Sequence, residues 1–314
     1  MGDGLARVEE ALRRAVRSDD AFLTEVASHL VEAGGKRLRP AMAVAAGSVG
    51  SADGIGDDLV QGGVAVELVH LGSLYHDDVM DEATTRRRVE TVNARWGNLT
   101  AILAGDFLLA RASEIASSLG TEVAGLLAAT IGSLCEGQVR ELQRAYDTSR
   151  TEEAYFLAIA GKTAALFSTS CRIGALVGRL PRAEVDALTC FGQRFGMAFQ
   201  IVDDVLDLVA TEEDLGKPVG NDLVEGVYTL PVIRALATPV EGAELAAMLG
   251  KPLQRPEVDK ARGLVRDGTA VDEALDIARG FTEEAVAAVA ELPPGPAVDQ
   301  LMATARHLVA AVPA

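Results

Sequence analysis

Apolar residues recur at helical spacing along almost the whole chain, and this pattern limits the fold more than any other feature. Two clear runs, with an apolar residue every three or four positions, occupy residues 5–16 and 64–75. Aromatic residues make up only 4% of the 314 residues, whereas alanine and leucine, which favour helices, are abundant. Segments 102–116 and 156–177 are apolar on more than one face and should be central. The sequence therefore predicts an all-α fold built as a large helical bundle.

Short connections between the helical stretches favour one domain that spans residues 1–314. Segments 47–58 and 216–226 are interpreted as loops and not as domain boundaries. The proline-containing segment 293–296 should end one helix before a final amphipathic helix.

The net charge of -17 makes nucleic acid and anionic membranes poor partners. An anionic ligand would need local basic clusters or metal ions. Three widely spaced cysteines argue against a disulfide framework or a zinc site and suit a reducing compartment. The chain shows no signal peptide and no apolar run long enough for a membrane anchor, so we expect a cytoplasmic protein.

The first candidate site is an acidic cluster, Asp77, Asp78 and Asp81, at the end of an apolar helical run. Asp77 and Asp81 are four residues apart, so they project from one face of a helix and repel each other unless a cation lies between them. Mg²⁺ suits this position because it uses few carboxylates and shares its shell with water and phosphate. The alternative is an acidic patch at a helix end, although unpaired carboxylates on a buried helix are unfavourable.

A second cluster, Asp203, Asp204 and Asp207, repeats the D-D-x-x-D pattern inside the apolar run 195–209. Two such carboxylate pairs that face each other in a helical bundle would form a metal site with several ions. The repetition makes two coincidental acidic patches a weaker explanation.

Cations gather near these carboxylates in an otherwise acidic protein. The segment Gly34-Gly35-Lys36-Arg37-Leu38-Arg39-Pro40 places three of them beside a glycine turn, and Arg86-Arg87-Arg88 follows the first acidic cluster. Glycines allow close backbone approach, and arginine and lysine bind phosphate oxygens. Lys162 and Lys217 are further cations in apolar or loop contexts. Each basic cluster alone would be interpreted as solvated surface, but together they indicate a phosphorylated ligand.

In this order, the motifs resemble those of the trans-prenyl diphosphate synthase (polyprenyl synthetase) family. The resemblance covers about residues 34–231 and rests on GGKRLRP, ELVHLGSLYHDDVMDEATTRR, the GQ at Gly137-Gln138, the GKT at Gly161–Thr163, FQIVDDVLD and LGKPVGNDLVEGVYTLPV. It is most similar to long-chain bacterial members. The resemblance implies the all-α isoprenoid synthase fold around a central cavity, usually as a homodimer. The implied substrates are isopentenyl diphosphate and an allylic diphosphate.

The resemblance also implies roles for individual residues. Asp77, Asp81 and Asp203 would bind about three Mg²⁺ ions per site, with Asp78, Asp204 and Asp207 completing the inner or second shell. Arg86, Lys162 and Lys217 would contact the allylic diphosphate, and Thr163 and Gln200 would steady the reacting region. The diphosphate of isopentenyl diphosphate would be held by Lys36, Arg39, His70 and Arg87. His70, seven residues before Asp77, could instead be a core histidine.

The chain departs from the family pattern at Arg88, where the family usually has glycine, and this puts the local turn geometry in doubt. The implied reaction ionises an allylic C–O bond, and metal ions with arginine and lysine stabilise the charge that grows on the departing diphosphate. The double bond of isopentenyl diphosphate then attacks the cation. No nucleophilic side chain is needed, and water must be excluded.

Product length should depend on the residues that precede Asp77 on its helix. Gly72 and Ser73 are small, where short-chain members of the family carry bulky aromatics. A helical turn rises about 5.4 Å, comparable with one isoprene unit, so Val69, Ala65 and Gly62 would line successive units. We therefore expect a product of about six to ten units (about C30–C50). A floor from elsewhere, such as Phe107, would give a geranylgeranyl or geranylfarnesyl product (C20–C25) instead.

Two rival functions share this fold. A terpene cyclase usually has a different second metal motif and lacks GGKRLRP. A non-catalytic subunit of a two-component synthase typically loses aspartates, whereas this chain keeps all six. Both are therefore weaker explanations than a catalytic synthase.

Overall fold

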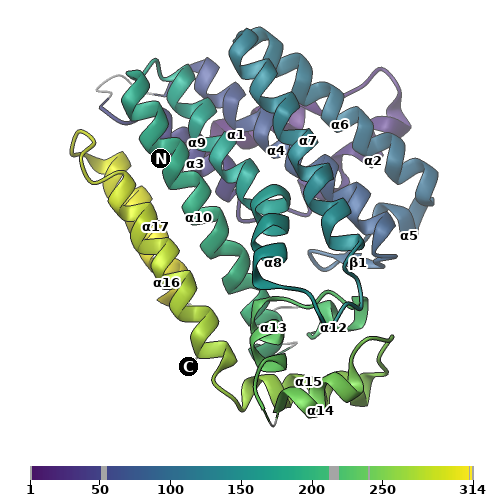
Figure 1. The fold of residues 1–314 in the computed structure, drawn as a ribbon. Coiled ribbons are helices and arrows are strands. Elements are labelled where there is room, and N and C mark those ends of the chain that lie inside the picture. The colour runs from purple at the N-terminus through teal and green to yellow at the C-terminus, as the bar shows by residue number, and fades with distance from the viewer. Residues whose placement is uncertain (1, 51–54, 212–218, 240, 311, 313–314) are drawn as a thin grey trace. The chain divides into compact units, whose positions relative to one another are not determined.

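The computed structural model describes residues 2–50, 55–211, 219–239, 241–310 and 312 (Figure 1). Across these residues the chain is almost entirely helical, and a two-stranded hairpin is the strand structure among them. The predicted all-α class is confirmed. No helix in the described ranges combines the length and the apolar character needed to cross a membrane.

The elements up to the end of α7 are α1 (Gly2–Ala15), α2 (Ala21–Glu32), α3 (Leu38–Gly47), α4 (Asp57–Met80), β1 (Thr85–Arg86), β2 (Val89–Glu90), α5 (Val92–Trp96), α6 (Asn98–Leu119) and α7 (Thr121–Leu142). The later elements are α8 (Glu152–Ile159), the π-helical turn η1 (Ala160–Ala164), α9 (Ala165–Val177), α10 (Arg182–Val209), α12 (Asn221–Glu225), α13 (Leu230–Leu236), α14 (Glu241–Met248), α15 (Arg255–Arg266), α16 (Ala270–Ala288) and α17 (Pro296–Ala310).

The chain divides into two compact units, and the predicted single domain over residues 1–314 stays a prediction. The first unit comprises residues 1–132, 166–192 and 288–301, and the second comprises residues 133–165, 193–287 and 302–314. One D-D-x-x-D motif lies in each unit. The two units are described separately below.

Helix α4 is the core of the first unit and carries the first acidic motif at its C-terminal end. It packs against α6 most extensively and also against α1 and α3. This helix is apolar around its whole circumference, as expected for a helix covered on all sides. Gly72 permits a close approach, because a Cβ atom there would lie 3.0 Å from the Gly105 carbonyl oxygen of α6.

In the second unit, α10 packs with α8 and α16 around an apolar cluster that includes Tyr155, Ile159, Ile201 and Val205. A second cluster, with Leu208, Leu223, Tyr228 and Val258 among its members, joins the end of α10 to α12, α13 and α15. Both clusters meet at the C-terminal half of α10. The second acidic motif therefore sits on a helix that is held firmly along its length.

Two details of the sequence interpretation need correction. Residues 102–116 of α6 are not central on every face, because Leu103 is 65% exposed and Ile102 39% exposed, although Ala104 and Leu108 are buried. The predicted loop 216–226 contains the short helix α12 in its described part. In the predicted loop 47–58, α3 ends at Gly47 and α4 begins at Asp57, while residues 51–54 lie outside the described residues. Pro296 begins α17 as expected.

Candidate active site

The first acidic motif forms the last turn of α4, and its three carboxylates differ in exposure. Asp77 is half-buried and Asp81 is exposed, whereas Asp78 is fully buried. Asp78 accepts a hydrogen bond from Arg86 Nε at 2.5 Å. Burial raises the pKa of Asp78, and the adjacent Arg86 opposes that shift. Asp78 thus orients Arg86, while Asp77 and Asp81 remain at the surface of the helix end.

Strands β1 and β2 form an antiparallel hairpin in which Arg86 pairs with Val89. The two residues between them, Arg87 and Arg88, both have positive φ, 53° and 65°. A two-residue hairpin turn with both φ angles positive is type I′, which usually takes asparagine or glycine. This geometry favours glycine at position 88, and Arg88 adopts the turn with a bulky side chain.

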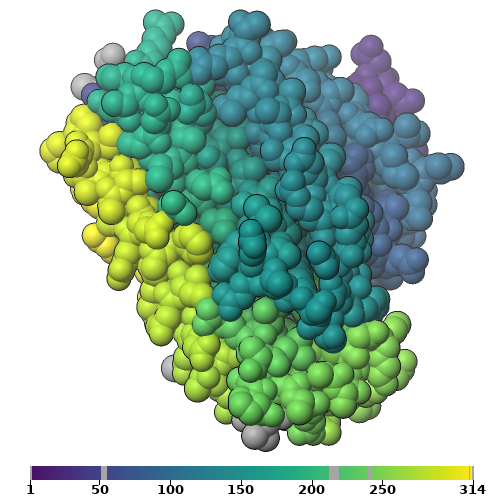
Figure 2. Space-filling view, in the orientation of Figure 1, coloured from purple at the N-terminus to yellow at the C-terminus, as the bar shows by residue number. Residues whose placement is uncertain are grey.

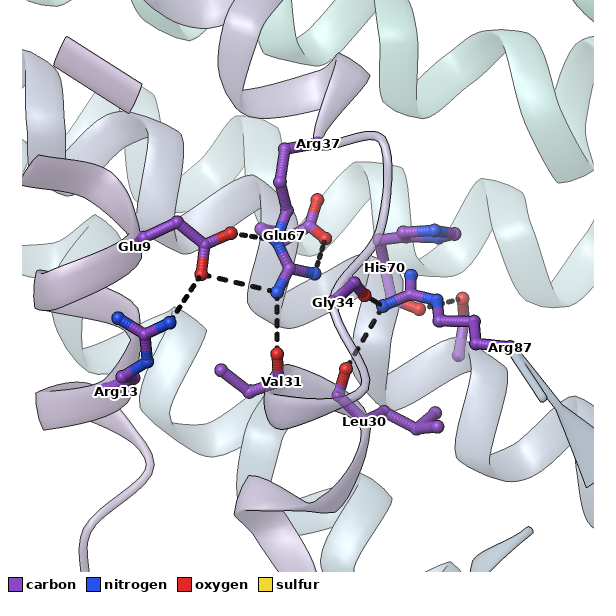
Figure 3. Close-up of polar contacts among 10 residues, drawn as sticks. Glu9, Arg13, Leu30, Val31, Gly34, Arg37, Glu67, His70 and Arg87 are labelled. Carbon is purple, nitrogen blue, oxygen red and sulfur yellow. Dashed lines mark hydrogen bonds and ion pairs between the residues drawn. The ribbon is translucent and has the colours of Figure 1, made fainter. Parts of the chain in front are cut away.

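Gly35 of the basic motif makes room for the side chain of Arg87, which lies against this loop (Figure 3). A Cβ atom on Gly35 would lie 2.8 Å from the Arg87 Cζ atom. The Arg87 guanidinium donates hydrogen bonds to the carbonyl oxygens of Leu30, at 3.1 Å, and Gly34. The glycines were interpreted as allowing a ligand to approach. In the structure the group that approaches the backbone is Arg87.

Arg37 is the one cation of the GGKRLRP motif that is bound inside the protein. Its guanidinium donates to Glu9, to Glu67 Oε1 at 2.9 Å and to the Val31 carbonyl oxygen at 2.9 Å. Lys36, in contrast, is exposed, and the Arg39 guanidinium lies 4.4 Å from the centre of the Phe167 ring. Burial lowers the pKa of Arg39 to about 10, so Arg39 is still charged at neutral pH. Lys36 and Arg39 can therefore bind a ligand, whereas the Arg37 guanidinium is occupied by contacts within the protein.

His70 lies on α4 between the basic cluster and the first acidic motif. Burial, together with the charges of Arg39 and Arg87, lowers its pKa well below the usual value for histidine. The imidazole is therefore neutral, and it can donate one hydrogen bond without adding charge. The first unit thus brings together the predicted residues Arg39, His70, Arg86 and Arg87.

In the second unit the central carboxylate is Asp204. It is buried, and it accepts hydrogen bonds from the Tyr155 hydroxyl at 2.5 Å and from Gln200 Nε2 at 2.7 Å. The Thr163 hydroxyl donates in turn to Gln200 Oε1 at 2.6 Å. The predicted residues Thr163 and Gln200 therefore form a chain that ends at the acidic motif. The sequence interpretation missed Tyr155, because no local pattern ties a residue of α8 to α10.

Several more carboxylates surround Asp204. Burial raises its pKa to about 7, and the charges of Asp203 and Glu141 act in the same direction. The backbone N–H of Asp222 donates to Asp207 Oδ2 at 3.2 Å, and burial also raises the pKa of Asp222. Asp222 was missed as a site residue, although it lies within the LGKPVGNDLVEG motif. Such an excess of negative charge favours cations.

Lys162 lies in the π-helical turn η1 and forms an ion pair with Glu141. Single π-helical turns are frequent at functional sites. Gly137 packs directly against this turn, since a Cβ atom there would collide with the Lys162 backbone nitrogen and lie 2.9 Å from the Gly161 carbonyl carbon. This contact explains the glycine of the GQ motif. Lys217 lies outside the described residues.

The donor set fits a magnesium ion better than a tightly chelated metal. Within the described ranges, no three His, Cys, Asp or Glu side chains are grouped closely enough to hold a metal. Mg²⁺ takes one or two carboxylates and completes its shell with water and phosphate oxygens. Asp77 with Asp81, and Asp203 in the other unit, are accessible carboxylates of this kind.

A family model described as Polyprenyl synthetase matches residues 20–265. This chain belongs to the polyprenyl synthetase family. It is 42% identical over 262 residues to a protein of Geobacillus stearothermophilus named heptaprenyl diphosphate synthase component 2, covering 83% of this chain and 79% of that one. Other relatives are named nonaprenyl, octaprenyl and geranylgeranyl diphosphate synthases.

Solved structures agree with this membership. The heptaprenyl diphosphate synthase of Staphylococcus aureus superposes with a TM-score of 0.94 at 32% identity, over 98% of both chains. A polyprenyl synthase of Caulobacter crescentus CB15, complexed with calcium and isoprenyl diphosphate, gives a TM-score of 0.93 at 34% identity, over 98% of this chain and 94% of that one. The isoprenoid synthase fold and the prenyltransferase class are confirmed.

Proposed function

We propose that this protein condenses isopentenyl diphosphate with an allylic diphosphate to give a linear trans-polyprenyl diphosphate. One observation carries the proposal. A single helix, α4, holds a neutral His70 among arginines and, two turns further on, the carboxylates Asp77 and Asp81. A basic site and a cation site on one helix suit a substrate pair in which both members carry diphosphate.

In this proposal, Asp77, Asp81 and Asp203 would hold about three Mg²⁺ ions, and the bound ions would supply positive charge that stabilises the departing diphosphate. Arg86, Lys162 and Lys217 contact that same diphosphate. Asp78 holds Arg86 in place through the 2.5 Å hydrogen bond. Calcium in the Caulobacter complex supports a divalent cation in this family.

Lys36, Arg39, Arg87 and His70 bind the diphosphate of isopentenyl diphosphate. Because the His70 imidazole is neutral, it donates a hydrogen bond and offers no proton to the cation. Thr163 and Gln200, which are linked by hydrogen bonds to Asp204, would steady the reacting region. The proton lost from the condensed product goes to the departing diphosphate, so no side chain acts as a base.

The product is proposed to be long, about C30–C50, because relatives named for hepta-, octa- and nonaprenyl products are among the most similar. A geranylgeranyl product is the second candidate, since relatives with that name are 35% and 40% identical. The test is product analysis of the purified chain with Mg²⁺, labelled isopentenyl diphosphate and separate allylic primers. Linear chains beyond C25 support the proposal, a stop at C20 favours the second candidate, and no condensation with any primer refutes both.

The active form is proposed to be a homodimer in the cytoplasm. An apolar face of α6 is exposed, with Leu99 79% and Leu103 65% accessible, and this segment reaches the surface in the space-filling view (Figure 2). Exposed apolar patches mark interaction sites. Light scattering should show a dimer that Leu103→Glu dissociates and that Phe22→Glu, at an exposed residue of α2, leaves intact. A monomer in the unaltered protein would refute the homodimer.

A two-component enzyme is the alternative assembly, because two relatives are named component 2 of a heptaprenyl diphosphate synthase. Turnover by the purified chain alone would exclude an obligatory second component. A chain that binds both substrates without turnover would favour a second component.

The cysteines Cys135, Cys171 and Cys190 are free, which agrees with a reducing compartment.

A further inference from the structure

Glu67 is a buried carboxylate for which the proposed reaction has no use. It lies on α4, three residues before His70, and its exposed fraction is 1%. Residues three apart on a helix are neighbours on one face, so Glu67 lies one turn below the predicted substrate histidine. A carboxylate in such a position is costly unless it is paired. Its partner is Arg37, at 2.9 Å between Nη1 and Oε1.

Arg37 connects this carboxylate to the loop that joins α2 to α3. Its remaining donors bind Glu9 of α1 and the Val31 carbonyl oxygen at the end of α2 (Figure 3). Its backbone is left-handed, with φ of 48°, a conformation that is unfavourable for a residue with a side chain. The ion pair thus holds a strained residue in place. Arg37 follows Lys36 of the loop and precedes Arg39 in the first turn of α3, and these two neighbours are the cations of the motif left for a ligand.

The opposite side of the same loop is held by Arg87, through the carbonyl oxygens of Leu30 and Gly34. Arg39 and Arg87 repel each other, and burial and this repulsion both lower the pKa of Arg39. The charge of Glu67 opposes those shifts for both arginines. Burial raises the pKa of Glu67 itself, and the three arginines favour its ionised form. Glu67 is therefore the fully buried counter-charge of this arginine cluster, and Glu9, which also pairs with Arg37, is the more exposed one.

We propose that Glu67 is a positioning residue for isopentenyl diphosphate: by anchoring Arg37, it fixes the end of the loop with Lys36 and the start of α3 with Arg39 before the substrate arrives. This inference rests on the proposed function, because it assigns these two cations to the diphosphate of that substrate. Donors that are already in place lose less freedom on binding and need no rearrangement during the reaction.

Charge alone would have the opposite effect. A carboxylate near a diphosphate site repels the diphosphate, so removing its charge should tighten binding if Glu67 has no positioning role. If Glu67 positions the loop, removing it should weaken binding. The sign of the change in KM for isopentenyl diphosphate therefore separates the two explanations.

The test compares Glu67→Gln with the unaltered enzyme. Glutamine keeps the shape and an acceptor oxygen but removes the charge that pairs with Arg37. We expect the KM for isopentenyl diphosphate to rise about tenfold, as is typical when a partner one shell away from a ligand is lost, and the KM for the allylic substrate to stay within about twofold. Glu122→Gln, at an ion-paired surface glutamate of the same unit, is the matched control and should change neither constant.

A double-variant cycle with Arg37→Gln shows whether the two residues act together. Changes in KM that are smaller in the double variant than the sum of the single effects support the pair. A fall in the KM for isopentenyl diphosphate, an unchanged KM, or equal rises for both substrates would each overturn the proposal. If Glu67→Gln does not fold, Glu67→Asp keeps the charge but withdraws it from Arg37 and should give the same selective rise. An unaltered enzyme that condenses no primer would refute the proposed function instead.

Discussion

The close contact at Gly72 gives a prediction that can be worked from the structure. Replacing Gly72 by alanine places a methyl group 3.0 Å from the Gly105 carbonyl oxygen and 3.1 Å from Leu109 Cγ. Overpacking of this kind costs about 1–3 kcal/mol, while alanine gains about 0.5–1 kcal/mol over glycine inside a helix. The free energy of unfolding of Gly72→Ala should therefore fall by up to about 2.5 kcal/mol.

Thermal unfolding measures this loss against a matched control. Gly125 of α7 has no atom within 4 Å of its added Cβ position, so Gly125→Ala should gain stability where Gly72→Ala loses it. The shift in Tm should be on the order of 2 °C for each kcal/mol. A Gly72→Ala protein as stable as the unaltered one would refute the packing argument.

The same contact bears on product length. Gly72→Phe is the direct test of a tail path along α4, but a ring at that position requires α6 to move. Ser73 is only half-buried, so Ser73→Phe tests the path with a smaller steric cost. The assignments of Gly72, Ser73, Val69 and Phe107 to product length stay predictions.

Three further predictions follow from the site. In the folded protein the pKa of Asp204 is raised to about 7 from its ordinary value of 3.8. The metal-free protein should therefore lose stability as the pH rises from about 4 to 7. Urea unfolding of Asp204→Asn should show a smaller loss over the same pH range. Arg88→Gly removes the side chain from a residue with left-handed backbone and should raise the free energy of unfolding by up to about 1 kcal/mol. A raised KM of this variant for either diphosphate would show that the Arg88 charge contributes to binding. EDTA should abolish turnover and added Mg²⁺ should restore it, whereas activity that survives EDTA would contradict the metal assignment.

Much of the fold follows from local sequence pattern. The long apolar runs predicted α1, α4 and α10, because helical periodicity depends only on neighbours along the chain. The acidic motifs were placed at the right points of α4 and α10 for the same reason. The α6 error has a physical cause, since an apolar helix face gives the same pattern whether it is buried in its own chain or exposed.

Contacts between distant segments could not be predicted from the sequence. Nothing in GGKRLRP distinguishes Arg37, which is buried by Glu9 and Glu67, from its accessible neighbour Lys36. The glycine at position 35 indicated a close approach, but not that Arg87, 52 positions later in the chain, would be the group that approaches. Such partners are set by packing, which brings together residues that share no local pattern.

In both acidic motifs the two adjacent aspartates have different surroundings, and helix geometry explains the difference. Adjacent residues on a helix point about 100° apart, so the two aspartates of each D-D pair cannot face the same way. In both motifs the second aspartate points inward and is held by its own donors, Asp78 by Arg86 and Asp204 by Tyr155 and Gln200. The first aspartate, Asp77 or Asp203, stays accessible. In the proposed function the outward carboxylate would meet the cation, while the inward one fixes neighbouring side chains, so the two acids of each pair have different roles.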